Sequence, residues 1–294
     1  RAADVDVDGD GKGEIVTIPG PGRDASLKVF TADGKLLKES LAYPHSLQGG
    51  AHLTTIDLAG DGKKEIVTSP GPGGGPHVRL WNGDLTNIGR DFFAFDQSMR
   101  DGITVTTVRT LTGPQIVAAP ESWNEPVVRR YSLGLDAHLE KEFDAFDATS
   151  KNGVTVAAVD VNGDGIDEIA AAQNGGTTPE VRLFDLNGGK MAPYLVADPA
   201  YRGGLSLGAY GAGGQLLMTM PTAPVVRGPV DIEQKIDVNL KQQRLTLFEH
   251  ARVANSFLIS SGVARHPTPV GQTTVLKKIP IMDYRWNYGP GNPD

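Results

Sequence analysis

Cysteine is absent from this 294-residue chain, and aromatic residues make up only 6% of it. Without cysteine the chain forms no disulfide, no cysteine-ligated zinc site and no thiol nucleophile. Long apolar runs are absent too, since none approaches the roughly 18 residues that a membrane span requires. The sequence therefore predicts no membrane span and no cysteine chemistry within these residues.

Positive charge is also in deficit. The chain has 28 Lys and Arg against 35 Asp and Glu, a formal net charge of −7, which argues against binding to nucleic acid phosphates. Glycine and proline are in excess, with 37 and 20 residues, while a hydrophobic fraction of 39% still suffices for a core. The composition predicts a folded chain with unusually frequent turns.

An acidic motif recurs along the first two thirds of the chain. It begins at Asp6, Asp57 and Asp160, and each copy ends in a glutamate followed by two apolar residues. A shortened copy at residues 108–117 has lost its acidic residues. The equivalent positions Glu14, Glu65, Gln115 and Glu168 are separated by 51, 50 and 53 residues. This spacing defines a repeat of about 50 residues.

Two further sets of residues keep the same period. Basic residues precede aromatic ones by two positions in four pairs: Lys28/Phe30, Arg79/Trp81, Arg129/Tyr131 and Arg182/Phe184. A third set is Tyr43, Phe95 and Phe146. Either the paired residues pack within the repeat or they line a binding surface, and the packing interpretation is the simpler one.

Each repeat contains strand-length runs separated by turn residues, with nothing of helical period between them. Four short strands per unit predict an all-β fold, a β-propeller of four-stranded blades, followed by the start of a second β-rich domain. We place blades at about 1–47, 48–100, 101–150 and 151–201, a partial fifth at 202–222, a linker at 223–230 and the second domain at 231–294. Completing the fifth blade would require strands from outside this sequence.

The acidic segments predict calcium-binding loops, because oxygen ligands fall on alternate residues and glycines let the backbone curl around a hard cation. The alternative is a solvated turn rich in Asp and Asn. The predicted ligands of loop 1 (residues 6–14) are Asp6, Asp8, Asp10, the Lys12 carbonyl and Glu14. Those of loop 4 (residues 160–168) are Asp160, Asn162, Asp164, the Ile166 carbonyl and Glu168.

Loop 2 (residues 57–65) is a weaker candidate, because Ala59 stands where an oxygen ligand is expected. Its predicted ligands are Asp57, Asp61, the Lys63 carbonyl and Glu65. Loop 3 (residues 108–115) has no acidic ligand, so we expect it to bind no metal. The sequence thus predicts two structural Ca²⁺ sites and a third candidate.

The repeated Asp-x-[Asp/Asn]-Gly-Asp-Gly-x-x-Glu-Ile-Val loop resembles the FG-GAP/VCBS repeats of extracellular, integrin-like β-propellers. This resemblance covers residues 1 to roughly 222. It implies a calcium-binding propeller outside the cytoplasm, at the cell surface, the cell wall or in the periplasm. It implies no single activity, since members serve adhesion, sugar binding and display of attached domains.

Residues 231–294 resemble the opening of an L,D-transpeptidase (YkuD-type) catalytic domain. The matching pieces are Asp-Val-Asn-Leu-Lys-Gln-Gln-Arg-Leu-Thr-Leu-Phe-Glu, Phe-Leu-Ile-Ser-Ser-Gly and His-Pro-Thr-Pro-Val-Gly-Gln-Thr-Thr-Val. That family attacks peptidoglycan stem peptides with a cysteine thiolate, and a histidine serves as the base. Because the chain has no cysteine, no catalytic residue is assigned, His266 included, and we expect the chain alone to be inactive.

Two functions follow from these resemblances. In the first, a calcium-stabilised propeller carries an L,D-transpeptidase-type domain that cross-links peptidoglycan in the cell envelope. In the second, the propeller is a non-enzymatic module that binds a cell-surface glycan or protein. A propeller glycosidase has only the carboxylates of the predicted calcium loops in its favour. We expect the natural protein to extend beyond both ends of this sequence.

Overall fold

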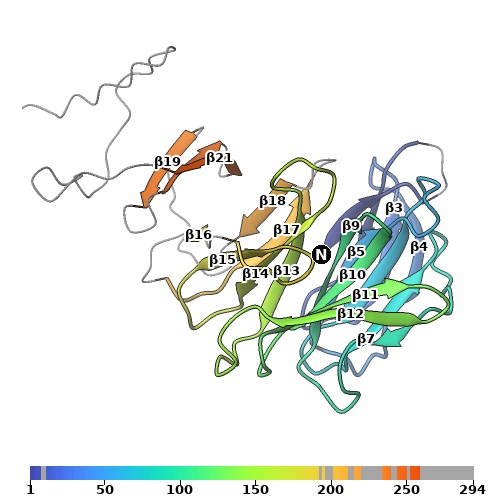
Figure 1. Cartoon of the computed structure of the whole chain (residues 1–294). Coiled ribbons are helices and arrows are strands. Elements are labelled where there is room, and N and C mark those ends of the chain that lie inside the picture. The colour runs from blue at the N-terminus through green and yellow to red at the C-terminus, as the bar shows by residue number, and fades with distance from the viewer. Residues whose placement is uncertain are drawn as a thin grey trace, which may run out of the picture. The chain divides into compact units, whose positions relative to one another are not determined.

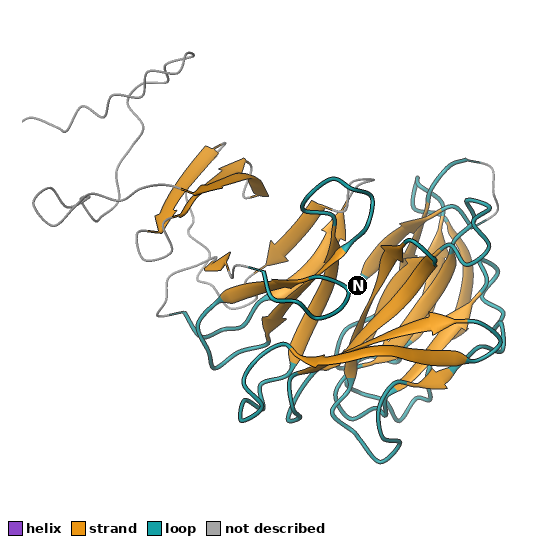
Figure 2. Ribbon diagram, in the orientation of Figure 1, coloured by secondary structure: helices purple, strands orange, loops and turns teal. Residues whose placement is uncertain are grey.

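The computed structural model describes residues 1–7, 11–191, 194–195, 201–210, 215–219, 234–239, 244–249 and 252–258. The chain divides into two compact units, residues 1–230 and 231–294. The described residues form strands, turns and irregular segments and contain no helix (Figures 1 and 2). The all-β prediction is confirmed.

The described residues of the first unit form four antiparallel sheets of four strands and one strand pair. Sheet 1 comprises Ala2–Val5 (β1), Glu14–Thr17 (β2), Ser26–Phe30 (β3) and Leu36–Leu41 (β4). Sheet 2 comprises Ala51–Ile56 (β5), Glu65–Pro70 (β6), His77–Trp81 (β7) and Phe92–Phe93 (β8). Sheet 3 comprises Ile103–Thr110 (β9), Gly113–Pro120 (β10), Val127–Leu133 (β11) and Ala137–Asp144 (β12).

Sheet 4 comprises Val154–Val159 (β13), Glu168–Gln173 (β14), Glu180–Phe184 (β15) and Tyr194–Leu195 (β16), and sheet 5 is the pair Ser206–Tyr210 (β17) and Gln215–Thr219 (β18). Within each sheet, neighbouring strands are consecutive in the sequence. The apolar first two strands of sheet 4 are buried along their whole length, whereas the fourth strands of sheets 1 and 3 are largely exposed. In sheet 3, the largely buried first strand β9 thus forms the inner edge and the exposed fourth strand β12 the outer edge.

The inner strands of successive sheets lie against one another, β1 on β5, β5 on β9, β9 on β13 and β13 on β17 (Figure 1). Side-chain hydroxyls join them. Thr107 Oγ1 on β9 donates to the Thr55 carbonyl on β5 at 2.8 Å, and Thr104 Oγ1 donates to the Val154 carbonyl on β13 at 2.8 Å. Sheet 3 is thereby bonded to both of its neighbours.

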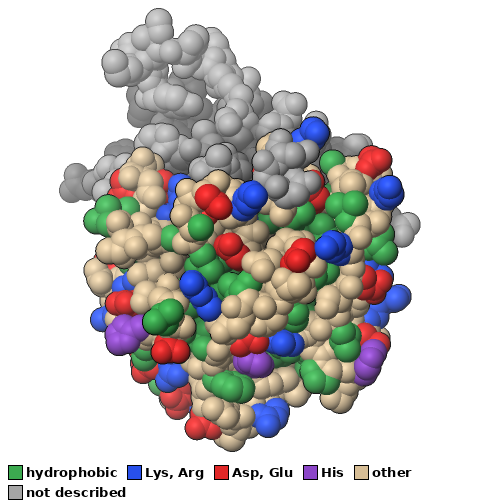
Figure 3. All heavy atoms as spheres, turned by 90° about the vertical axis from the view of Figure 1, so that its right-hand side faces the viewer, with side chains coloured by type: hydrophobic (Ala, Val, Ile, Leu, Met, Phe, Trp, Pro, Cys, Tyr) green, Lys and Arg blue, Asp and Glu red, His purple; other side chains and the backbone are tan. Residues whose placement is uncertain are grey.

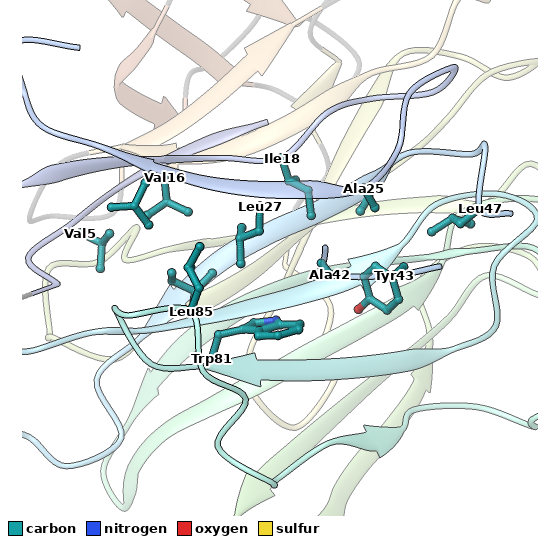
Figure 4. Packing of buried hydrophobic residues seen from close by; sticks show 13 residues of the cluster. Val5, Val16, Ile18, Ala25, Leu27, Ala42, Tyr43, Leu47, Trp81 and Leu85 are labelled. Carbon is teal, nitrogen blue, oxygen red and sulfur yellow. The ribbon is translucent and has the colours of Figure 1, made fainter. Parts of the chain in front are cut away.

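Apolar side chains fill the space between successive sheets. The cluster between sheets 1 and 2 places Val16, Leu27 and Tyr43 against Trp81 and Leu85 (Figure 4). Equivalent clusters lie between sheets 2 and 3, sheets 3 and 4, and sheets 4 and 5. A sheet inside the series carries apolar side chains on both faces because a neighbour covers each face, which explains why the repeat occurs in tandem.

Arginines of the third strands bind the end of the preceding sheet. Arg129 Nη1 on β11 donates to the Ala94 carbonyl at 3.0 Å, and its guanidinium lies 4.6 Å from the centroid of the Phe95 ring. Arg182 on β15 repeats this arrangement with Ala145 and Phe146, and Arg79 on β7 repeats it with Ala42 and Tyr43. The basic and aromatic pairs of sheets 2, 3 and 4 are therefore packing residues, as the simpler interpretation predicted, whereas Lys28 Nζ of sheet 1 lies 3.2 Å from Glu39 Oε1 of its own sheet.

Glycines with positive φ bring neighbouring sheets into backbone contact. Gly153, with φ of 71°, precedes β13, and a Cβ placed there would lie 1.7 Å from the Glu121 carbonyl oxygen of sheet 3. The same close approach occurs at Gly50, Gly102 and Gly204, with φ of 73°, 69° and 82°. No other residue type fits these positions, because a side chain would meet both backbone strain and a steric clash.

In the second unit, Gln234–Asn239 (β19), Arg244–Glu249 (β20) and Arg252–Leu258 (β21) form a three-stranded antiparallel sheet. The register pairs Asp237 with Thr246 and Thr246 with Ser256, and a bulge follows at Leu247/Phe248. The described part of this segment is thus β-structured, as expected for the second β-rich domain at residues 231–294.

We expect Gly153→Ala to lower the free energy of unfolding by about 2–5 kcal/mol, since the left-handed conformation costs about 1–2 kcal/mol and overpacking about 1–3 kcal/mol. Gly89→Ala is the matched control, because Gly89 has φ of 72° but a Cβ added there would meet no atom within 4 Å. The control should lose only about 1 kcal/mol. Urea unfolding measures both; equal losses would contradict the role of the close approach.

Candidate functional site

The three acidic loops connect the first and second strands of sheets 1, 2 and 4, and they share two hydrogen bonds. In each, the second residue donates its N–H to the closing glutamate: Val7 to Glu14 at 3.0 Å, Leu58 to Glu65 at 3.0 Å and Val161 to Glu168 at 2.8 Å. The repeat seen in the sequence is therefore a repeat of backbone geometry.

The first aspartate of each loop accepts from the glycine five residues later. Oδ2 of Asp6, Asp57 and Asp160 accepts from the N–H of Gly11, Gly62 and Gly165 at 2.9, 3.0 and 3.0 Å. These glycines have φ of 82°, 87° and 85°. Their left-handed conformation turns the chain so that the aspartate side chain lies inside the loop.

Loop 4, which like loop 2 is described along its whole length, brings an amide between two carboxylates. Asn162 Nδ2 donates to Asp164 Oδ2 at 3.0 Å and to Glu168 Oε1 at 3.2 Å. Burial raises the pKa of the Glu168 carboxyl, and the charges of Asp164 and Asp160 raise it further. The loop therefore gathers carboxylates that repel one another and attract a positive group.

Loop 2 has a similar arrangement of hydrogen bonds. Asp57 Oδ1 accepts from Gly60 and Asp61, and the Lys63 N–H donates to Asp61 Oδ1 at 3.0 Å, as the Ile166 N–H does to Asp164 Oδ1 at 2.8 Å. In loop 1, the predicted ligands Asp8 and Asp10 lie outside the described residues, whereas Asp6, Lys12 and Glu14 lie within them.

Within the described ranges, no three His, Cys, Asp or Glu side chains converge on one point as a preformed metal centre requires. The two loops that the structure describes in full instead satisfy their carboxylates with backbone N–H groups and, in loop 4, with Asn162. The Ca²⁺ ligands expected from the sequence therefore stay a prediction.

Loop 3 is a tight hairpin in which Gly113, with φ of 113°, follows the turn between β9 and β10. Gln115 occupies the register position of the glutamates, because it pairs with Val108 as Glu168 pairs with Val159. Arg130 Nη1 donates to Gln115 Oε1, and Arg130 Nε donates to the Leu186 carbonyl of sheet 4 at 3.0 Å. A side-chain cation therefore occupies this end of sheet 3.

An ion pair that the sequence did not reveal joins this hairpin to loop 4. Arg109 Nη2 lies 2.6 Å from Asp167 Oδ1 and 3.5 Å from Asp160 Oδ2. Hydrogen bonds to Asp167 raise the pKa of the Arg109 guanidinium. The available signal was the extra acid at position 167, where loops 1 and 2 have Gly13 and Lys64.

Two hollows lie on the surface of the first unit. One of about 520 Å³ lies beside Leu58, Gln115, Arg130 and Glu140. The other, of about 390 Å³, is lined by Tyr43, Pro44, His77, Phe93, Gln97 and Arg100, and the His77 and Phe93 rings stack with centroids 4.6 Å apart.

Acidic and basic side chains alternate over the face shown in Figure 3, with no continuous basic patch on it. This agrees with the net charge of −7. The part of the chain that the structure describes contains no helix long and apolar enough to cross a membrane.

Comparison with known proteins finds a match within the second unit. Residues 233–294 match the model of the L,D-transpeptidase catalytic domain, YkuD, so this segment is similar to a domain of L,D-transpeptidase type. The match confirms that part of the sequence resemblance. No curated protein matches the chain.

Solved structures give weaker likenesses. An exotype rhamnogalacturonan lyase, YesX, is 15% identical over 84% of this chain and 61% of that chain, with a TM-score of 0.42. An Agrocybe aegerita lectin that recognises non-reducing terminal N-acetylglucosamine is 16% identical over 74% of this chain and 60% of that chain, with a TM-score of 0.43. BBS1N in complex with ARL6DN is 11% identical over 88% of this chain and 80% of that chain, with a TM-score of 0.43. The chain thus spans 61% and 60% of the length of the first two.

The pH dependence of stability should report on His77. Burial lowers the pKa of its imidazole, and the Arg79 charge lowers it too, while Asp91 opposes them. The unfolded chain then binds a proton more readily than the folded one, so stability is full above about pH 6.5 and falls as the pH drops through the lowered pKa. Relative to His77→Gln, the wild-type melting temperature should fall as the pH drops below about 6.5; parallel curves for the two proteins would contradict the lowered pKa of His77.

Proposed function

We propose that this chain belongs to a cell-envelope protein in which a calcium-stabilised β-propeller carries an L,D-transpeptidase-type domain directed at peptidoglycan. The observation that carries this proposal is the match of residues 233–294 to the L,D-transpeptidase catalytic domain. Such domains act on peptidoglycan, a substrate that lies outside the cytoplasm. The extracytoplasmic location follows from that substrate and from the resemblance of the acidic loops to those of extracellular propellers.

The chemistry assigned to this chain is limited by its composition. Transfer of a stem-peptide acyl group in the resembling family uses a cysteine thiolate, and this chain contains no cysteine. Residues 233–294 are therefore proposed to contribute the scaffold of the domain, beginning with the sheet β19–β20–β21, and no acyl-transfer step is assigned to them.

The propeller part of the proposal is supported by the arrangement of successive sheets in the first unit. Five sheets follow one another with their inner strands in contact, and a core cluster lies between each successive pair. Closure of the sheets into a ring belongs to the proposal, because closure removes the open faces of the first and last sheets.

The donor set of the acidic loops fits a calcium ion. Loop 4 supplies oxygens from Asp160, Asn162, Asp164 and Glu168, the hard ligands that Ca²⁺ prefers. The Asn162 amide nitrogen bonded to Asp164 and Glu168 is a partial positive charge between two carboxylates, and we propose that Ca²⁺ takes over this role. Loop 1 is proposed to bind Ca²⁺ in the same way, through Asp6, Asp8, Asp10, the Lys12 carbonyl and Glu14. Loop 2, the weaker candidate, is proposed to do so through Asp57, Asp61, the Lys63 carbonyl and Glu65.

Calcium should stabilise the chain. We expect EDTA to lower the melting temperature and excess CaCl₂ to restore it, since a site held at 100 times its dissociation constant adds about 2.7 kcal/mol. Asp160→Asn should reduce the increment that calcium restores. Asp147→Asn is the control, because Asp147 is an exposed residue whose carboxylate bonds only its own turn at Thr149. A melting temperature that is indifferent to EDTA would contradict the calcium sites.

Binding to peptidoglycan tests the rest of the proposal. The intact chain should sediment with purified peptidoglycan sacculi and remain in solution with cellulose. Thr246→Pro should abolish sedimentation, because Thr246 lies on the central strand β20 and proline removes a ladder hydrogen bond. Thr246→Ser is the matched control. Binding to cellulose as strong as to sacculi, or sedimentation unchanged by Thr246→Pro, would argue for the alternative of a general surface-binding propeller.

A further inference from the structure

The register of the sheets gives Arg109 an unexpected position. Val5, Ile56, Val108 and Val159 pair with Glu14, Glu65, Gln115 and Glu168, so these four residues are equivalent. The residues that follow them are Asp6, Asp57, Arg109 and Asp160. Sheet 3 therefore places a positive charge where the other three sheets place the first acidic residue of the loop.

The side chain of Arg109 binds the neighbouring loop 4 rather than its own hairpin. Its Nε donates to Asp167 Oδ1 and Oδ2 at 3.1 and 3.2 Å, and its Nη2 donates to Oδ1 at 2.6 Å. Its backbone N–H donates to Asp167 Oδ2 at 2.6 Å, and the Asp167 N–H donates to the Arg109 carbonyl at 3.1 Å. These bonds fix the guanidinium relative to the loop.

The same guanidinium reaches the first aspartate of loop 4, since Arg109 Nη2 lies 3.5 Å from Asp160 Oδ2. The Asp160 and Asp167 side chains are 8% and 7% exposed, so their charges are poorly hydrated and depend on a nearby positive charge. Arg109 supplies that charge from the adjacent sheet.

We propose that Arg109 is a built-in counter-cation of loop 4, which stabilises the loop in the absence of calcium and lowers its affinity for calcium. This inference rests on the proposed calcium function. Two cations that share the Asp160 carboxylate repel each other, so each reduces what the other gains by binding. By linkage the effect is reciprocal: calcium in loop 4 weakens the contact between Arg109 and Asp160. The junction between sheets 3 and 4 thereby responds to calcium.

Substitution of Arg109 separates its effect on the stability of the calcium-free loop from its effect on calcium affinity. Without the Arg109 guanidinium, the buried Asp167 carboxylate has no counter-charge and keeps only the backbone N–H of residue 109, so the calcium-free protein should lose stability while the loop becomes more negative and binds calcium more tightly. Arg109→Lys keeps the charge but not the planar fork, so its calcium affinity should stay close to that of the chain with Arg109. Arg109→Gln with Asp167→Asn removes both charges but still releases Asp160 from Arg109, so its calcium affinity should remain tighter than that of the chain with Arg109.

The experiment uses the intact chain carrying Asp6→Asn and Asp57→Asn, so that loop 4 alone retains its first aspartate. Calorimetric titration with CaCl₂ should give an affinity about tenfold tighter for Arg109→Gln, within the usual range for coupled sites. Melting in EDTA should show a lower melting temperature for the same variant. Arg23→Gln is the charge-matched control, because it removes an exposed arginine at the end of sheet 1 that lies opposite loop 1. It should change neither the calcium affinity nor the melting temperature in EDTA.

The outcomes distinguish the two levels of the proposal. Absence of calcium binding in both the natural sequence and the chain with Asp6→Asn and Asp57→Asn contradicts the proposed calcium function and this inference with it. Calcium binding that is unchanged or weaker in Arg109→Gln contradicts the inference alone, because Arg109 would then be only a structural ion pair. Tighter binding that is lost in the double variant with Asp167→Asn also contradicts it, because the effect would then come from the uncompensated charge of Asp167 and not from the contact between Arg109 and Asp160.

Discussion

The close approach of backbone to backbone at the glycine junctions is the constraint on which the first unit depends. At Gly50, Gly102, Gly153 and Gly204 the chain enters the inner strand of a sheet in contact with the backbone of the sheet before it. This approach fixes the distance between sheets at one end of each junction. The Arg129 contact with Ala94 and the Thr104 contact with Val154 are possible only at that separation.

The two ends of the sheets therefore differ in how much their structure varies from one sheet to the next. The glycine junctions repeat the same backbone contact, whereas the loops at the other end carry different chemistry on equivalent frames. Loop 2 and loop 4 hold carboxylates against backbone N–H groups, and sheet 3 has replaced its loop with a hairpin and arginines. Variation at the loop end leaves the spacing of the sheets unchanged, because that spacing is set elsewhere.

Much of this architecture was predictable from the sequence, because a repeat turns local patterns into a consistent register. The markers at Glu14, Glu65 and Glu168 predicted equivalent loops, and the structure gives each glutamate the same hydrogen bond. Packing was the simpler of two interpretations of the basic and aromatic sets, and the contacts of Arg79, Arg129 and Arg182 support it. The L,D-transpeptidase-type domain followed from three short pieces in the correct order. The calcium ions were predicted from the same loops and still rest on sequence pattern and donor chemistry.

Contacts without a repeat were not predictable. Arg109 and Asp167 are 58 residues apart, and His52 and Glu121, whose Nε2 and Oε2 lie 2.8 Å apart, are 69 residues apart. Neither pair recurs in the other sheets, so no pattern marks it. The glycines at 50, 102, 153 and 204 do keep the period, yet their meaning depends on the opposing backbone, which the sequence does not display.

The order of the strands has a kinetic consequence. Every strand pairing that the structure describes joins strands consecutive in the sequence, and each glycine junction contacts the sheet immediately before it. Loop closure between such near segments costs little entropy, and low contact order favours rapid folding. Each sheet is complete once its own repeat is available and can serve as the template for the next. The chain is therefore suited to folding progressively from its N-terminal end while later repeats are still unfolded.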